Sequence, residues 1–302
     1  MTTLLELEPT ATVAKSLLDF VKTDAAVVDA CKNALKENSG NGNYIKFVSS
    51  LLSKPDVLFQ QDDQNDVLSI FNIVSHLVCT RVPDGEQAAL VKTLTATVTA
   101  SADNTKTRLR ILVALYNLMS ANAACSSYIA KELLKYATEN GHVNLISQGI
   151  LTIVSQVEAG GAAKEDVRDV MFAGHLALED YGSADEAQQL LVRYLATFEG
   201  ESAESMGAIK ERAAKGVVGA IKVPFVSFTG SERSRVSTFS SVKQLKDDAT
   251  YAPLYRLLTI FMEGSYADYM EFLGEHKAAF GKYGFEEALC TEKMRLLSLC
   301  SI

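Results

Sequence analysis

Apolar side chains recur every three or four positions through most of the chain, a pattern that predicts α-helices packed by one face. The clearest stretch runs from Pro253 to Phe280 and is expected to form two helices. The first helix has an apolar stripe made of Leu254, Leu257, Leu258, Phe261 and Met262. The second has a stripe made of Tyr266, Tyr269, Met270, Leu273 and Phe280. Neither stripe can be buried within its own helix, so the pair must pack on neighbours.

The joint between these two helices contains residues that favour helix ends. Gly264 is expected to end the first helix in the left-handed backbone region, where the lack of a Cβ atom avoids a clash. Ser265 is expected to cap the second helix, and Ser183 and Glu186 have the spacing of a capping box further upstream.

The same periodicity predicts helices along the rest of the chain. We expect them at 10–37, 44–52, 67–78, 88–99, 106–119, 128–137, 144–157, 167–181, 184–198, 205–221 and 285–300. Residues 223–228 are the strand-like exception, and the polar stretch 229–241 that follows is expected to be a solvated loop. These elements predict a protein built almost wholly from helices.

Three glycines between paired helices suggest a repeat. Gly141 and Gly182 are 41 residues apart (182 − 141), and Gly182 and Gly264 are 82 apart (264 − 182), or two such periods. A period near 40 is typical of two-helix solenoid repeats. We therefore predict an all-α fold, a right-handed solenoid of stacked antiparallel helix pairs of the HEAT or TPR kind.

The loop Ala159–Ala162 contains two glycines and is the best candidate for a domain boundary. We expect N-terminal helical repeats in residues 1–160 and a second helical region in 161–302. The last helix is still apolar where the sequence ends at Ile302, so we expect the natural protein to continue.

Composition and charge narrow the function classes. The net charge is −8, which argues against a protein whose main task is to grip nucleic-acid backbone. The five cysteines contain no CxxC pair, which indicates core thiols in a reducing compartment. The N-terminus lacks a signal peptide and no apolar run is long enough to span a bilayer, so a cytoplasmic protein is expected.

The sequence contains none of the common catalytic or metal-binding motifs. The four histidines are far apart, and no nucleophile elbow, phosphate loop or dinucleotide-binding glycine pattern occurs. We expect no enzyme activity, no cofactor and no metal site. Arg233 and Arg235 lie among serines in the polar stretch, where RNA contact or phosphorylation is the alternative to a plain loop.

Two segments resemble a known family. The sequence LYRLLTIFMEGSYADYMEFLGEHKAAF, followed by EKMRLLSLCSI, resembles the helical half of a PCI domain, the scaffold shared by the proteasome lid, the COP9 signalosome and translation initiation factor 3. With RLRILVALYNLM and ALEDYGSADEAQQLLVRYL, the likeness is closest to the family of m subunits of eukaryotic initiation factor 3 and spans residues 106–302. The polar stretch 229–236 is longer than the family pattern, and the winged helix that ends a PCI domain is missing.

The resemblance implies a non-catalytic scaffold subunit. Its expected neighbours are the PCI subunit a and the MPN-domain subunits f and h, with the 40S ribosomal subunit reached through the complex, and neither membrane nor direct RNA binding. The expected core of the PCI helices consists of Leu254, Leu257, Leu258, Phe261, Tyr269, Leu273, Met294 and Leu297. The implied role is assembly of the preinitiation complex and mRNA recruitment.

Three alternatives stay open at this point. The first is a PCI subunit of the signalosome (subunit 7) or of the proteasome lid. The second is a free helical-repeat adaptor, and the third is an RNA-binding module that uses Arg233 and Arg235. Composition does not separate the first from the initiation-factor role, whereas the net charge of −8 makes the third the weakest of the three.

Overall fold

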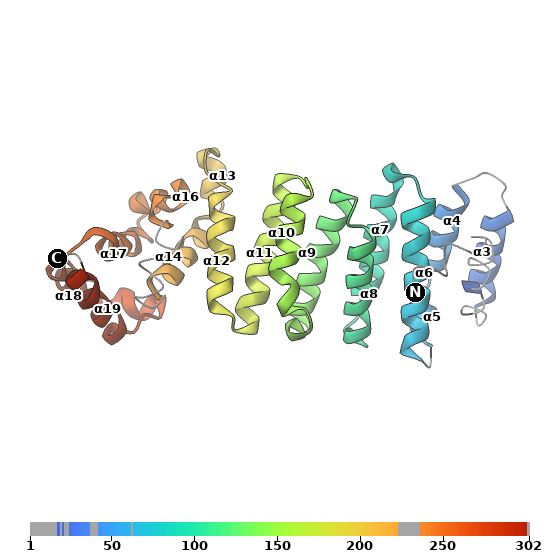
Figure 1. Ribbon diagram of the computed structural model, residues 1–302, viewed down its shortest axis with the longest axis horizontal. Helices are drawn as coiled ribbons and strands as arrows, with labels where there is room; N and C mark the ends of the chain where they lie inside the picture. Colours follow the sequence, from blue (N-terminus) through green and yellow to red (C-terminus); the bar gives the residue numbers. More distant parts are fainter. Residues whose placement is uncertain are drawn as a thin grey trace. The chain divides into compact units, whose positions relative to one another are not determined.

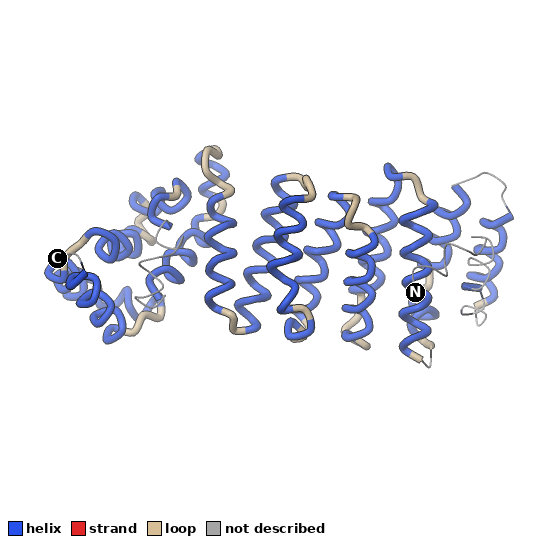
Figure 2. The backbone as a smooth tube through the Cα atoms, viewed as in Figure 1, coloured by secondary structure: helices blue, strands red, loops and turns tan. Residues whose placement is uncertain are grey.

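The computed structural model describes residues 17, 18, 20, 24–36, 42–61, 63–222 and 236–300. Within these residues every regular element is a helix (Figures 1 and 2). The expected all-α solenoid of stacked antiparallel helix pairs is confirmed. The strand-like segment 223–228, the first part of the predicted helix 10–37 and the expected joint near Pro224 lie outside the described residues.

The chain forms two compact units, Met1–Ala177 and Leu178–Ile302. The division falls inside helix α11, which runs from Lys164 to Tyr181. The domain boundary expected in the loop Ala159–Ala162 stays a prediction. That loop does separate helix α10 from helix α11.

Unit 1 stacks helices in two layers. Helix α6 packs on α8 in one layer, α7 packs on α9 in the other, and α8 packs on α9 between the layers. Its elements are α3 Ala25–Lys36, α4 Gly42–Leu52, α5 Pro55–Phe59, α6 Gln64–Arg81, α7 Asp84–Thr99, α8 Thr105–Leu118, α9 Ala123–Glu139, η1 Val143–Leu145, η2 Ser147–Gly149, α10 Ile150–Ala159 and the first part of α11. The segment that was expected to start one helix at Asn144 instead begins with the two 3-10 turns η1 and η2.

Helix α8 explains why the pattern in residues 106–119 is apolar on most sides. Leu109, Ile111, Leu112 and Leu115 are all at most 2% exposed, because α6, α7 and α9 each pack against this helix. A helix between neighbours buries several faces at once. Helix α7, whose threonines and valines also fit a strand, keeps its helical period and buries Leu90, Val91 and Leu94.

Unit 2 contains the rest of α11 and shorter helices. They are α12 Ala184–Ala196, α13 Ala203–Gly207, α14 Lys210–Lys222, α16 Ser240–Lys243, η4 Gln244–Asp247, α17 Ala252–Glu263, α18 Tyr266–Tyr283 and α19 Glu287–Cys300. The predicted helix 205–221 is in fact divided into α13 and α14. The end of the predicted loop 229–241 is also wrong in part, because residues 236–238 form a 3-10 turn and Ser240 begins α16.

The glycine joints differ in conformation. Gly141 (φ 67°) and Gly182 (φ 87°) take the left-handed region, and the following amide donates back to the carbonyl five residues earlier in each case. Gly264 does not: its backbone is extended, with φ −87° and ψ 167°. A Cβ atom at Gly264 would lie 2.9 Å from Ile260 Cα, so glycine is needed for close approach to the preceding turn.

Helix caps were predicted correctly at one joint and wrongly at another. Ser265 and Asp268 form a complete capping box at the start of α18. Ser183 stands at the N-cap of α12, but its side chain makes no capping hydrogen bond. Its backbone (φ −81°, ψ 66°) differs from the extended conformation of a usual capping residue.

Candidate interaction surface

The candidate site lies in unit 2, where α14 and α18 pack against α17, and α19 packs against α18. An aromatic cluster fills the space between these helices. The Phe261 and Tyr269 ring centroids are 5.8 Å apart, and Phe280 contacts Tyr269, Phe272 and Phe285 at 6.3, 6.4 and 5.9 Å. The Tyr269 hydroxyl and the Thr291 Oγ1 are 3.1 Å apart, which ties α18 to α19.

The structure buries most of the residues expected to form the core of these helices. Seven of them are at most 8% exposed: Leu254, Leu257, Leu258, Phe261, Tyr269, Leu273 and Met294. Leu297 is only partly buried. The placement of Met270 on the apolar stripe was wrong, since it is 44% exposed, and Phe272 occupies the core instead.

Helix α19 presents a leucine stripe to solvent. Leu289, Leu296 and Leu299 are 58%, 39% and 69% exposed, and their spacing of seven and three residues places them on one face. Helix α19 is therefore apolar on two faces, one toward α18 and one outward. An apolar helix face of this kind is typical of a protein-interaction surface.

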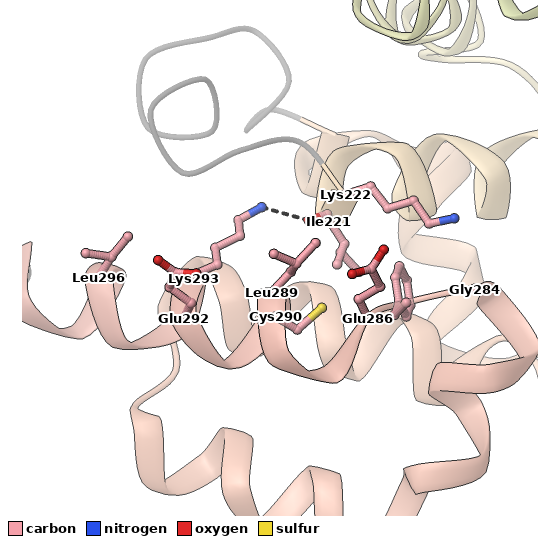
Figure 3. A pocket seen from close by; sticks show the side chains of 10 residues that line it. Ile221, Lys222, Gly284, Glu286, Leu289, Cys290, Glu292, Lys293 and Leu296 are labelled. Atoms are coloured by element: carbon pink, nitrogen blue, oxygen red, sulfur yellow. Dashed lines mark hydrogen bonds between the residues drawn. The ribbon is translucent and has the colours of Figure 1, made fainter. Parts of the chain in front are cut away.

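A cavity of about 530 Å³ lies beside this stripe, between the end of α14 and α19 (Figure 3). Leu289, Leu296 and Phe285 supply apolar lining, and Lys222 and Glu292 supply charge. In Figure 3 Leu289 and Lys293 extend from α19 toward Ile221 of α14. The cavity and the leucine stripe form one continuous surface, which we call the α19 surface.

Lys293 is buried at the base of this surface, an arrangement that sequence reasoning did not find. Its Nζ donates to the carbonyl oxygens of Ile221 (2.9 Å) and Ala220 (3.4 Å) in the last turn of α14. The amine also lies 5.3 Å from the centroid of the Phe261 ring. A cation at a helix C-terminus meets the negative end of the helix dipole and satisfies carbonyls that lack partners within the helix.

Burial shifts the pKa values around Lys293. Burial lowers the pKa of Lys293 to about 8, because the charged amine loses its hydration. Burial raises the pKa of the Cys290 thiol to about 11 and that of Tyr269 to about 12, since their charged forms are anions. Cys290 is thus a protonated core thiol at neutral pH and a poor nucleophile.

Unit 1 offers a smaller groove. Its volume is about 360 Å³, and Phe172, Ala173 and Leu176 of α11 form its apolar side. An ion pair of 3.1 Å between Lys131 and Asp169 crosses it. Two lysines and two acidic residues line it, so the groove shows no preference for the charge of a partner.

Groups that carry chemistry are scattered. Among the described residues, no three His, Cys, Asp or Glu side chains lie together as metal ligands would. His175 is buried beside Phe172, whereas His76, His142 and His276 are partly exposed and lie on different elements. In the part of the chain that the structure describes, no helix is long and apolar enough to cross a membrane.

Comparison with known proteins points to one group of relatives, although no model of a protein family matches the chain. The human protein "Eukaryotic translation initiation factor 3 subunit M" is 24% identical over 287 residues, which cover 94% of this chain and 71% of that protein. The subunit M of Phaeosphaeria nodorum is 24% identical over 78% of this chain and 53% of its own length. That of Nematostella vectensis is 30% identical over 45% of this chain and 33% of its own length. The chain is thus similar, over nearly its whole length, to proteins named as subunit M of eukaryotic translation initiation factor 3.

Proposed function

We propose that the chain is a non-catalytic scaffold subunit of eukaryotic translation initiation factor 3. The observation that carries this proposal is the similarity to subunit M over 94% of the chain. Stacked helix pairs support it, because a helical solenoid presents long surfaces suited to binding other proteins. The scattered placement of the histidines and cysteines is compatible with a role without chemistry.

The proposal includes a domain organisation. Residues 1–160 form helical repeats, and residues 161–302 form the helical half of a PCI domain. The buried set of Leu257, Phe261 and Tyr269 supports a tightly packed helical half.

The proposed partners follow from the resemblance. They are the PCI subunit a and the MPN-domain subunits f and h, with the 40S ribosomal subunit bound through the complex in the cytoplasm. The role is to hold the assembly that forms the preinitiation complex and recruits mRNA, through protein contacts and without direct binding to RNA or membrane. The exposed leucine stripe of α19 supports a protein partner, because an outward apolar face gains free energy when a neighbour covers it.

The first experiment is affinity purification of the tagged full-length protein from its own cells, with mass spectrometry of what stays bound. Initiation-factor subunits together with small-subunit ribosomal proteins are the expected result. Signalosome or proteasome-lid subunits would keep a PCI scaffold but refute the initiation role. A monomer with no stable partner would favour a free adaptor.

A surface variant locates the contact. Leu289→Glu with Leu296→Glu places two charges on the α19 surface, and we expect at least one subunit to be lost from the purified complex. Leu145→Glu is the matched control, because Leu145 is 48% exposed and lies in unit 1. Equal recovery of all subunits with both variants would show that the α19 surface does not bind them.

A further inference from the structure

Tyr181, the last residue of α11, is the one exposed tyrosine of this chain. All eleven tyrosines lie in the described residues, and Tyr181 is 49% exposed, whereas the other ten are buried or partly buried. Within the described part of the chain its hydroxyl has no hydrogen-bond partner. The hydroxyls of Tyr116 and Tyr136, by contrast, donate to Gln156 and to the Ser101 carbonyl. Tyr181 is therefore the tyrosine whose hydroxyl another protein can contact most readily.

Acidic residues surround Tyr181 in the sequence. Glu179 and Asp180 come directly before it, Asp185 and Glu186 follow at the fourth and fifth positions, and no other tyrosine of the chain has two acidic residues directly before it. Acid-directed protein tyrosine kinases select substrates by such a charge pattern, because basic side chains in their clefts pair with carboxylates beside the acceptor. Exposure and charge thus single out the same residue independently.

The backbone around Tyr181 is held by few bonds. The two residues before it and the residue after it are exposed. Two hydrogen bonds close the joint between α11 and α12: the Gly182 amide donates to the Glu179 carbonyl at 3.0 Å, and the Ser183 amide donates to the Leu178 carbonyl at 2.9 Å. Exposed backbone bonds at a helix end open at small cost. Opening of this one turn gives a kinase an extended segment, while Leu178 stays buried behind it.

We propose that Tyr181 is a phosphorylation site for an acid-directed protein tyrosine kinase, which reaches it when the last turn of α11 opens. The phenolic oxygen of Tyr181 attacks the γ-phosphorus of ATP. The new bond joins that oxygen to phosphorus, the bond from the γ-phosphorus to the bridging oxygen of ADP breaks, and the hydroxyl proton passes to the kinase base. The product adds about −1.5 to −2 charge at pH 7 to a joint that already carries four carboxylates. This site does not depend on the proposed role in translation.

The test of the site incubates the folded full chain with ATP and a purified tyrosine kinase that prefers acidic residues directly before its acceptor. Mass spectrometry is expected to find phosphate on Tyr181, and none at this position in Tyr181→Phe. Asp180→Asn should lower the rate about fivefold, the difference between a charge-assisted and a neutral hydrogen bond. A peptide of residues 174–188 serves as the control for kinase activity.

The test of the opening uses two glycines that close equivalent joints. Gly182 (φ 87°) and Gly141 (φ 67°) both take the left-handed backbone, and a Cβ atom would meet nothing within 4 Å at either. Alanine is unfavourable in this backbone region, so Gly182→Ala should populate the open turn more and raise the rate of phosphorylation roughly fivefold. Gly141→Ala is the matched control, because it opens the joint after α9 in unit 1 and should leave the rate unchanged.

The outcomes that would overturn the proposal are distinct for its two parts. Phosphate on the peptide but none on the folded chain, phosphate on another tyrosine in place of Tyr181, or a rate that does not depend on Asp180 would each refute the site. An unchanged rate in Gly182→Ala, or an equal rise in Gly141→Ala, would refute the opening of the last turn of α11 as the route to it.

Discussion

Among the described residues, Arg108 in unit 1 and Lys293 in unit 2 are buried cations at the end of a helix, and the two are held differently. In unit 1 Arg108 donates to the carbonyls of Thr97 (3.3 Å) and Val98 (2.7 Å) in the last turn of α7, and to the backbone carbonyl of Asp103 (2.7 Å). In unit 2 Lys293 donates to two carbonyls in the last turn of α14. Both solve the same problem, because the last carbonyls of a helix have no partner within it.

The aromatic rings beside the two cations differ in burial. Arg108 lies 3.6 Å from the centroid of the Phe59 ring, and Phe59 is only partly buried. Lys293 lies 5.3 Å from the Phe261 ring, and Phe261 is 2% exposed within the aromatic cluster. In unit 1 we therefore expect the guanidinium to contribute more to the stability of the fold than the ring beside it. In unit 2 we expect the ring to contribute more than the amine. The expected effects of substitution test this difference.

The largest effect is expected at Phe261. Phe261→Ala removes a buried ring that contacts Tyr269 and leaves a cavity, so we expect a loss of about 3–5 kcal/mol in the free energy of unfolding. Phe59→Ala is the control in unit 1 and should cost roughly 1–2 kcal/mol, because its ring is partly exposed already. Urea unfolding of both variants gives the comparison. Equal losses in the two variants would contradict the expectation that the ring matters more in unit 2 than in unit 1.

Arg108 should show the next largest effect. Arg108→Met keeps the length of the side chain but leaves the buried carbonyls of Thr97 and Val98 and the part-buried carbonyl of Asp103 without their donor, at an expected cost of about 3 kcal/mol. Hydrogen exchange should rise first in α7 and α8, which the guanidinium joins. Arg108→Lys is the informative second variant, since an amine lacks the planar fork and should recover only part of the loss. Full recovery by lysine would mean that charge alone matters at this site.

The sequence predicted the positions of the helices better than it predicted which face of each helix is buried. Spacing of three and four fits both Met270 and Phe272 to an apolar face of α18, and only the neighbouring helices decide that Phe272 is buried. Helix α19 is a sharper case, because its leucines occupy two faces and periodicity cannot tell which face meets α18. The candidate surface is the outward face. The periodicity that predicted the helix could not show that this face is the exposed one.

The buried cations were missed for a related reason. Arginine and lysine side chains in a helix are usually exposed to solvent. The partners of Arg108 and Lys293 are backbone carbonyls, which every residue carries, so the sequence does not show which carbonyls they bind. The carbonyls of Ala220 and Ile221 precede Lys293 by more than 70 residues, so only tertiary packing joins them. Gly264 was assigned the wrong conformation because glycine is chosen for close approach as well as for a left-handed backbone.

The dependence of stability on pH separates the two cations further. Burial lowers the pKa of Lys293 from 10.5 to about 8, so between pH 8 and 10.5 the unfolded chain binds a proton that the folded chain lacks. Stability from this group must therefore rise with pH across that window, by up to about 3 kcal/mol. Cys290 and Tyr269 act in the opposite direction, because their raised pKa values make the folded chain hold protons that the unfolded chain loses.

The contribution of Lys293 is obtained by difference. Unfolding of the wild-type chain and of Lys293→Met is measured at several pH values from 7 to 10.5. The wild type should gain stability relative to the variant as pH rises through 8. A constant difference would mean that the folded pKa of Lys293 is not lowered. Arg108→Met should show no such trend, since arginine stays protonated throughout this range.

The smallest effect is expected for Lys293→Met at pH 7. The substitution removes the two hydrogen bonds to the end of α14, which costs stability, but it also removes a charge that burial makes unfavourable, which restores much of it. A thioether of similar length keeps contact with the Phe261 ring. The net change should stay within about 1 kcal/mol, against about 3 kcal/mol for Arg108→Met. A loss of about 3 kcal/mol in Lys293→Met would contradict this expectation. It would show that the amine stabilises the end of α14 as much as the guanidinium stabilises the end of α7, so that the two units hold their cations in the same way.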